Sequence, residues 1–326
     1  MTDSGCGLGM QQTREMLRQR QAIRQAVRQV FDRDGFLEVD TPVLSLEVLP
    51  EPHIEPLRLA TADRHQRFLQ ASPEALMKRL LAAGAGPIYQ FAHAFRDGER
   101  GSRHDIEFLL LEWYAPGSTL DDAAALLEKL MTATLGTRGL ERLSCQDAFS
   151  DCAGVDLMAS DSSHLAEAAR RADVELPQGW DGDEEPVRFD RLFELLLSEV
   201  IAPRLGHQRP TMLEAWPCSQ AAFARLDPCD ATLARRFELF SGGVELANGW
   251  EEETSAEELR RRIETANEIR SADGRSRLPF PERLIAAHRH HMPDGVGAAL
   301  GFDRLVMLAA GASSIDQIRP FTSNTA

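Results

Sequence analysis

Residues 87–114, PIYQFAHAFRDGERGSRHDIEFLLLEWY, decide the fold because they predict two β-strands joined by a polar loop. Aromatic residues alternate along 87–96, and a second extended pattern follows over 105–114. On the second strand, the two-residue period places Glu112 and Tyr114 on one face together with apolar side chains. A carboxylate and a phenol among apolar neighbours indicate the wall of a pocket rather than a solvent-facing surface.

The rest of the chain predicts helices around further strands. Helical spacing and capping signals predict helices over 13–34, 75–83, 120–135 and 255–271, with helical segments near 162–172 and 189–201. A hairpin is expected over 236–250, and a Gly/Ala-rich strand over 295–301 runs into a helix that ends at Gly311. Antiparallel strand pairs with surrounding helices favour the α+β class. We expect a flexible N-terminus over 1–13 and one domain over 14–326, in which 137–235 forms a helical insertion.

Composition narrows the class of protein. The chain has 36 basic and 51 acidic residues, a net charge of −15, which argues against broad nucleic-acid binding. It contains neither a membrane-length apolar run nor a leader peptide, so we expect a cytoplasmic protein that binds no membrane. Lys78 and Lys129 are its only lysines, and neither lies in a GK[ST] phosphate loop. Arginines would therefore have to hold the phosphates of any bound nucleotide.

Cysteines and histidines do not predict a metal site. The five cysteines form no C-x-x-C pair and show no zinc-ligand spacing, so we expect them to be buried or idle thiols. His288, His290 and His291 lie in a charged helical stretch, and we expect them on a solvated face.

Three clusters of charged residues fit nucleotide chemistry. They are Arg96 and His104 at the two ends of the polar loop, the glutamates Glu238, Glu245 and Glu252 spaced seven apart, and Arg304 shortly after Gly301 at a helix start. Arginines and a helix N-terminus suit phosphates, and carboxylate oxygens suit Mg²⁺. Each cluster alone is typical of a solvated surface, but their joint occurrence is more specific.

These stretches resemble a known family. FLEVDTP (36–42), FRDGERGSRHDIEF (95–108) and GAALGFDRLVM (297–307) resemble motifs 1, 2 and 3 of the class II aminoacyl-tRNA synthetases. SPEALMKRLL (72–81) and GGVELANGWEE (242–252) are similar to the lysine-type subgroup. We expect the chain to begin at the catalytic domain, without the N-terminal anticodon-binding domain, and in this it looks like the elongation factor P lysyltransferases. The resemblance implies an antiparallel β-sheet flanked by helices, a catalytic domain over 14–326 and a homodimer formed through motif 1.

The resemblance also implies roles for individual residues. Arg96 and Arg304 match the catalytic arginines, which contact the α- and γ-phosphates of ATP. The full set expected to bind ATP is Arg96, Gly98, His104, Asp105, Phe108, Glu238, Glu245, Leu246, Gly301 and Arg304. Of these, Glu238 and Glu245 match the Mg²⁺-binding acids. The set expected to bind the amino-acid substrate is Ser72, Glu74, Glu112, Tyr114, Asn248, Trp250, Glu252 and Ala299.

Some residues depart from the family pattern. Gly98 stands where a glutamate usually hydrogen-bonds the adenine amino group, although Glu99 follows it. Asp105 replaces an asparagine and Ile106 a proline, while Trp250 replaces a phenylalanine of the substrate pocket. These changes bear on nucleotide affinity and on substrate identity.

The reaction that the resemblance implies is ATP-dependent activation of (R)-β-lysine, or of lysine, followed by transfer to a lysine side chain of elongation factor P. No tRNA is expected to take part. A buried distal ammonium needs a paired carboxylate, and attack of a carboxylate on ATP needs arginines and Mg²⁺ to neutralise charge. Ala299, where full-length lysyl-tRNA synthetases have glycine, indicates a preference for the β-amino acid. Two alternatives stay open: adenylation for another acceptor, and a catalytically weak regulatory paralogue.

Overall fold

The computed structural model describes residues 10–326 and divides them into two units. The first unit comprises residues 10–119, 133–136 and 252–326, and the second comprises 120–132 and 137–251. Residues 1–9, which form most of the N-terminus predicted to be flexible, lie outside the described residues, as does Cys6. The first helix, α1 (Met10–Arg33), begins directly after them.

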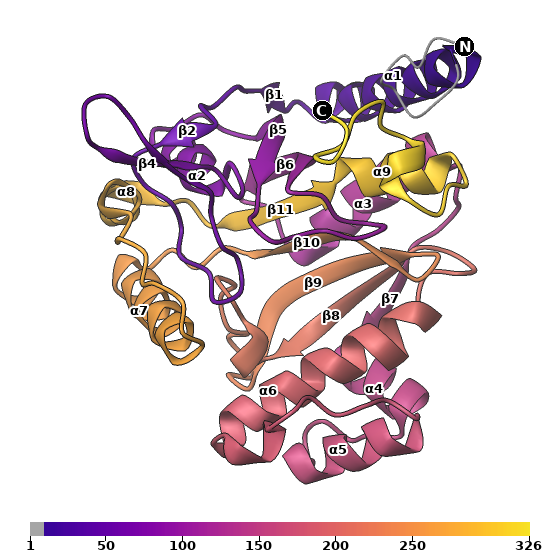
Figure 1. Ribbon diagram of the computed structural model, residues 1–326, viewed down its shortest axis with the longest axis vertical. Helices are drawn as coiled ribbons and strands as arrows, with labels where there is room; N and C mark the ends of the chain where they lie inside the picture. Colours follow the sequence, from indigo (N-terminus) through magenta and orange to yellow (C-terminus); the bar gives the residue numbers. More distant parts are fainter. Residues whose placement is uncertain (1–9) are drawn as a thin grey trace. The chain divides into compact units, whose positions relative to one another are not determined.

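The predicted strand–loop–strand lies in the sheet of the first unit. This part of the sheet has the order β1 (Leu37–Glu38), β5 (Ile88–Phe95), β6 (Glu107–Pro116), β11 (Gly295–Gly301), and Figure 1 shows the last three side by side. β6 pairs antiparallel with both β5 and β11, whereas the short β1 pairs parallel with β5. In this register Glu112 lies opposite Ala299, and Tyr114 lies opposite Gly297. The antiparallel frame of the predicted α+β fold is confirmed.

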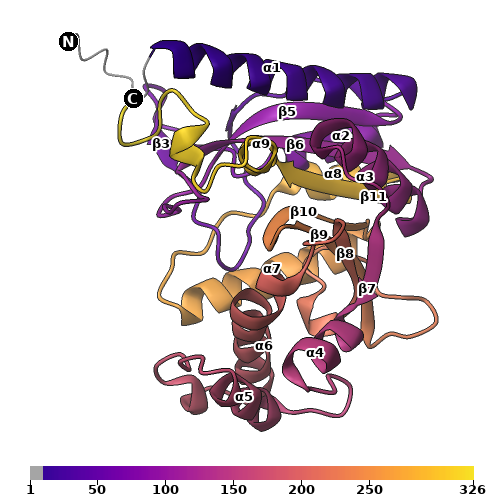
Figure 2. The ribbon, with the colours of Figure 1, turned by 90° about the vertical axis from the view of Figure 1, so that its right-hand side faces the viewer.

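The other elements of the first unit surround this sheet. A small antiparallel sheet has the order β2 (Leu44–Ser45), β4 (Gln66–Leu69), β3 (Arg58–Ala60). The remaining elements are α2 (Glu74–Ala82), α7 (Ala256–Ala272), α8 (Glu282–His291), α9 (Phe302–Ala309) and the 3₁₀ turn η5 (Ile315–Gln317). Helix α1 lies along β5 (Figure 2), and the Phe31 ring stacks on the Tyr89 ring with 4.5 Å between centroids. Burial of the apolar face of α1 therefore fixes it against the strand that leads into the polar loop.

The second unit has four strands and its own core. Their order is β10 (Val244–Glu251), β9 (Leu233–Ser241), β8 (Thr211–Pro217), β7 (Glu141–Ser144), and β9 and β10 form the predicted hairpin. The helical elements are α3 (Leu120–Leu135, of which 120–132 belong here), α4 (Cys145–Ala153), α5 (Ser162–Arg171), α6 (Glu185–Leu196) and the short turns η1 (Trp180–Gly182), η2 (Leu197–Ile201), η3 (Ala202–Arg204) and η4 (Cys218–Gln220). Phe149, Phe193 and Trp216 form the centre of the core.

The segment 137–235 is helical between α4 and η3, but it also supplies β7 and β8, which the sequence pattern did not predict. On β8 the adjacent residues Met212 and Leu213 are both fully buried, so the strand has no alternation by which it could be recognised. Cys145 is buried in this core, whereas Cys218 and Cys229 are exposed. Within residues 10–326, no helix is both long and apolar enough to cross a membrane.

Candidate active site

A buried lysine lies between two of the acids predicted to bind substrate. Lys78 Nζ is 2.5 Å from Glu74 Oε1 and 2.7 Å from Glu252 Oε2. Glu74 is four residues earlier on α2, so the helix itself brings the first pair together, while Glu252 directly follows β10 in the sequence. Burial alone would lower the pKa of Lys78, but the two carboxylates outweigh burial and raise it. Lys78 is therefore a permanent cation inside the predicted substrate slot, and the sequence reasoning missed it.

The third acid of this slot, Glu112, is held by hydroxyl groups. Ser72 Oγ donates to Glu112 Oε2 at 2.7 Å, and the Tyr114 hydroxyl donates to Glu112 Oε1 at 2.6 Å. Burial, with a further contribution from the charge of Glu74, raises the pKa of Glu112 to about 8, although both hydroxyls act in the opposite direction. In the absence of substrate, Glu112 therefore carries a proton over most of the neutral range.

Small residues on β11 give the slot its shape. A side chain at Gly297 would overlap the Glu252 carboxylate and the Tyr114 ring, so only glycine fits at that position. Ala299 is two residues farther along the same face and lies opposite Glu112. The structure thus brings Ser72, Glu74, Glu112, Tyr114, Glu252 and Ala299 into one region of the first unit.

The first catalytic arginine predicted from the sequence, Arg96, directly follows β5. Its guanidinium lies over the Phe108 ring at 5.0 Å from the centroid, and Nε donates to the Ala71 carbonyl at 3.3 Å. Nη1 is 3.4 Å from Glu99 Oε1, so the acid next to Gly98 is directed at Arg96. Gly98 itself has φ +77°, a left-handed conformation that disfavours any side chain there. This turn explains the glycine in place of the usual glutamate.

The second predicted catalytic arginine meets the polar loop. Arg304, in the first turn of α9, donates through Nη2 to His104 Nε2 at 2.5 Å. The start of α9 is itself anchored, because Asp303 Oδ2 accepts from the Leu109 backbone N–H at 2.9 Å. Gly301 immediately precedes this helix as its N-cap residue. The structure therefore brings His104, Gly301 and Arg304 together.

Asp105, also predicted to contact ATP, is directed elsewhere. Its carboxylate accepts hydrogen bonds from the backbone N–H of Ile106 and from Arg319 and Ser323 near the C-terminus. Burial would raise the pKa of Asp105, but the bonds from Ser323 and Ile106 and the charge of Arg319 outweigh it and lower the pKa.

In the second unit, one inserted residue brings Asn248 onto the face that the predicted nucleotide acids share. The pairing of β9 and β10 shifts between Glu245 and Ala247, so Leu246 is the extra residue of a β-bulge. Because of it, Glu245 lies opposite Phe240 and Asn248 lies opposite Glu238, although residues three apart on a regular strand face opposite ways. Glu238, Glu245 and Asn248 therefore share one face. Leu246 is buried, so only its backbone could contact a nucleotide.

Arg236 organises this face, and the sequence reasoning missed it too. Its Nη2 is 2.6 Å from Glu238 Oε1, and its Nε donates to Asn248 Oδ1 at 3.3 Å. Its guanidinium also lies 4.0 Å from the centre of the Trp216 ring. Trp250 is directly opposite Arg236 on β10, and its ring centroid is 6.5 Å from that of Phe223.

The two acids of this face fit a divalent cation. Burial and the neighbouring charge of Glu245 raise the pKa of Glu238 to about 8, although Arg236 acts in the opposite direction. Two carboxylates that repel each other in a buried place are suited to Mg²⁺, which usually takes one or two carboxylates and completes its shell with phosphate and water. No group of three or more candidate metal ligands occurs among the residues that the structure describes, so the remaining oxygens would come from the nucleotide.

Of the three histidines on α8, one does not lie where it was predicted. His290 and His291 are exposed, but His288 is buried with Leu284 and Ile285 on the inner face of the helix. Burial, together with the charge of Lys78, lowers the pKa of His288 to about 4, while its Nδ1 is 3.0 Å from the Leu284 carbonyl. His288 is thus a neutral core residue, because helical periodicity turns it inward.

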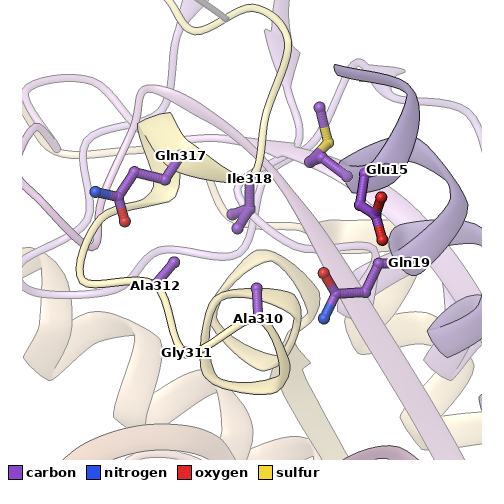
Figure 3. A pocket seen from close by; sticks show the side chains of 8 residues that line it. Glu15, Gln19, Ala310, Gly311, Ala312, Gln317 and Ile318 are labelled. Carbon is purple, nitrogen blue, oxygen red and sulfur yellow. The ribbon is translucent and has the colours of Figure 1, made fainter. Parts of the chain in front are cut away.

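A separate cavity of about 490 Å³ lies between α1 and the segment after α9 (Figure 3). Glu15, Gln19, Gln317 and Ile318 are among the residues that line it, and Gln19 Nε2 donates to the Ala309 carbonyl at 3.0 Å. None of the predicted site residues borders this cavity.

Each unit thus holds its own part of the predicted site. The first unit contains Ser72, Glu74, Arg96, Gly98, His104, Asp105, Phe108, Glu112, Tyr114, Glu252, Ala299, Gly301 and Arg304, and the second contains Glu238, Glu245, Leu246, Asn248 and Trp250.

Comparison with known proteins finds similarity over nearly the whole chain. Residues 6–325 match the family model of the tRNA synthetases class II (D, K and N). The elongation factor P--(R)-beta-lysine ligase of Edwardsiella ictaluri (strain 93-146) is 38% identical over 315 residues, which cover 95% of both chains. Proteins of the same name from Klebsiella pneumoniae (strain 342) and Salmonella arizonae are each 37% identical, with the same coverage.

Proposed function

Because this chain belongs to the class II tRNA synthetase family (D, K and N), we propose that it is an ATP-dependent ligase that attaches (R)-β-lysine to a lysine side chain of elongation factor P. Relatives that carry this activity in their names match 95% of the chain. The buried charges of the substrate slot in the first unit also support this class of substrate.

The observation that carries the proposal is the charge balance of the substrate slot. Three buried carboxylates, Glu74, Glu112 and Glu252, surround one internal cation, Lys78. When all three acids are ionised, this group carries two uncompensated negative charges. A buried site of this kind favours a ligand with two ammonium groups, which lysine and β-lysine both have and neutral amino acids lack.

The reaction has two steps. First, the substrate carboxylate attacks the α-phosphorus of ATP, which forms the acyl-adenylate and releases pyrophosphate. The acceptor amine then attacks the acyl carbon, an amide forms, and AMP leaves. The first step brings two anions together, so fixed cations must neutralise charge as it develops. Arg96 would contact the α-phosphate and the substrate carboxylate, and Arg304 would contact the γ-phosphate.

Further residues bind and orient the nucleotide and the substrate. Glu238 and Glu245 would hold Mg²⁺, which supplies additional positive charge to the phosphates when it is bound. Glu112 and Glu252 would bind the distal ammonium, and Glu74 the amino group near the carboxylate. Ser72 and Tyr114 hold Glu112 by the hydrogen bonds described above. As the family motifs imply, the residues proposed to bind ATP also include Gly98, His104, Phe108 and Leu246. Those proposed to bind the amino-acid substrate also include Asn248 and Trp250.

The chain is proposed to act as a homodimer. Leu37 is 60% exposed, and Val43, Leu44 and Leu46 in the following segment are also large exposed apolar residues. Together they form an apolar stretch around β1 and β2 that a second copy would cover. We propose that the reaction takes place in the cytoplasm and without a role for tRNA.

The test is ATP–pyrophosphate exchange with lysine and both enantiomers of β-lysine, followed by mass measurement of elongation factor P. We expect the fastest exchange with (R)-β-lysine and a mass increase of one lysyl group on the factor. Exchange without modification would point to another acceptor. If no lysine isomer supports exchange, the enzyme assignment is wrong, and the regulatory alternative replaces it.

A further inference from the structure

The polar loop that carries His104 is clasped by the end of the chain. We call residues 96–106 the motif 2 loop and residues 315–324 the C-terminal clasp. The Ile315 backbone N–H donates to the Ser102 carbonyl at 2.9 Å. Near the other end of the clasp, Arg100 Nη1 donates to Asn324 Oδ1 at 2.7 Å. Contacts at both ends show that the clasp follows the loop rather than touching it at one point.

Asp105 and Arg319 form the buried centre of this contact. Arg319 Nη1 is 2.9 Å from Asp105 Oδ2, and the two side chains are only 16% and 5% exposed. The Ser323 backbone N–H donates to the same oxygen at 3.0 Å, and the Ile106 N–H donates to Oδ1 at 2.9 Å. Arg319 Nη1 also donates to the Glu107 carbonyl at 2.7 Å. One arginine thus joins the end of the loop, the start of β6 and the clasp.

The contact depends on a residue that departs from the family pattern. An asparagine at position 105 would be neutral and could stay buried without a cation. A buried aspartate, in contrast, must be paired, and Arg319 supplies the positive charge. Asp105 and Arg319 therefore depend on each other, and neither side chain is directed to the nucleotide in this arrangement.

From these contacts we propose that Arg319 is a positioning residue for ATP binding. Arg319 holds Asp105, and Asp105 is the sequence neighbour of His104. His104 in turn contacts Arg304. Phe108 lies on β6 just beyond the carbonyl that Arg319 binds. With the clasp in place, His104 and Phe108 are held in position before ATP arrives. The inference rests on the proposed function only in taking this loop as part of the ATP site.

The experiment measures ATP affinity by calorimetry, with Mg²⁺ and without amino acid, in the full chain and four variants. Arg319→Met should weaken ATP binding by about ten- to a hundredfold, the range for displacement of a binding group by a distant change. Arg319→Lys should restore part of the affinity because it keeps the charge. Arg260→Met is the matched control, since Arg260 makes an exposed ion pair with Glu282 far along the sequence from the loop.

The decisive variant is the double change Asp105→Asn with Arg319→Met. It removes the ion pair without leaving a buried charge alone, so its thermal stability should approach that of the parent. A positioning role predicts that ATP affinity stays low in this stable variant, while the KM for the lysine substrate changes less than about twofold. Parental ATP affinity in the double variant would show that Arg319 only stabilises the fold, and would overturn the proposal.

Two further outcomes separate this inference from the proposed function. If the parent binds ATP but catalyses no exchange with any lysine isomer, the proposed function fails, while the calorimetric comparison still decides the role of Arg319. If the parent does not bind ATP, the positioning role is overturned, because the loop is then not part of an ATP site.

Discussion

Lys78 and Glu252 form an ion pair of 2.7 Å although both side chains are only 3% exposed. Together with Glu74, which is 2.5 Å from the same ammonium, they form a buried triad of one cation and two anions. Such a triad fixes both carboxylates before substrate binds, because each already has one oxygen committed to Lys78. The substrate then meets oriented acids and does not have to organise them.

The triad predicts a large loss of stability when its cation is removed. Lys78→Met leaves two buried carboxylates without their internal partner, which should lower the free energy of unfolding by about 3–5 kcal/mol. Chemical denaturation at pH 7 measures this change. Lys129→Met is the matched control, since Lys129, the only other lysine, is exposed on α3 and its removal should have a much smaller effect. Equal losses in the two variants would contradict the central place of Lys78.

Glu252 predicts selectivity for a distal ammonium. Glu252→Gln should weaken transition-state binding of the lysine substrate by about 2–4 kcal/mol, because a buried charged pair is broken. The measurement is kcat/KM in ATP–pyrophosphate exchange. Glu257→Gln, at an exposed position in the first turn of α7, is the control and should leave the activity unchanged. Equal activation of lysine and norleucine by the parent would refute the assignment.

Glu112 predicts that stability falls as pH rises. Its pKa, ordinarily 4.5, is about 8 in the folded chain, so between these values the folded state holds a proton that the unfolded state has lost. Within that range the group lowers the free energy of unfolding by about 1.4 kcal/mol per pH unit. Glu238, whose pKa is also about 8, adds to the slope. Denaturation of the ligand-free protein from pH 5 to pH 8 should show the decline, and Glu112→Gln should make it shallower.

The same carboxyl predicts proton release on binding. A substrate ammonium favours the ionised form of Glu112, so its arrival should expel the proton at pH 7 and affinity should increase up to about pH 8. Calorimetry in buffers of different ionisation enthalpy counts the protons released. No proton exchange in the parent, or the same release in Glu112→Gln, would exclude Glu112 as the group.

Ala299 predicts a preference between α- and β-amino acids. Its β-carbon, opposite Glu112 on the neighbouring strand, adds one methyl group to the wall of the slot. Ala299→Gly should relax the preference for β-lysine, by at most the ~1–3 kcal/mol that one methylene in a pocket is worth. The measurement is kcat/KM for (R)-β-lysine and for lysine in both proteins. An unchanged ratio would assign Ala299 to strand packing alone.

Local patterns were sufficient for the strands within 87–114 and 295–301 and for the hairpin, but not for β7 and β8. The alternation along 105–114 predicted that Glu112 and Tyr114 share a face, and the hydrogen bond between them agrees. Lys78 was not predicted, because a lysine four residues after a glutamate on a helix usually forms an exposed pair. Glu252, 174 positions away, contacts the same ammonium and makes the pair part of the slot.

Other features depended on packing that the sequence does not display. Arg236 lies in an ordinary charged stretch, and its role becomes visible only when β9 and β10 are paired and Glu238 is seen beside it. His288, in contrast, was within reach of a local pattern, because helical spacing places it on the same face as Leu284 and Ile285. The Asp105–Arg319 pair joins positions 214 apart, beyond the reach of any local pattern.

The bulge at Leu246 makes the position of Asn248 depend on an irregularity of the pairing and not on the side chain that fills it. Almost any apolar residue could occupy position 246, because its side chain only fills the core. If the strand paired regularly from Glu245 onward with Leu246 kept in the ladder, Ala247 would lie opposite Glu238, and Asn248 would turn to the other face, away from both acids. A related chain without the bulge would therefore need one residue fewer between these positions to keep the amide beside the acids.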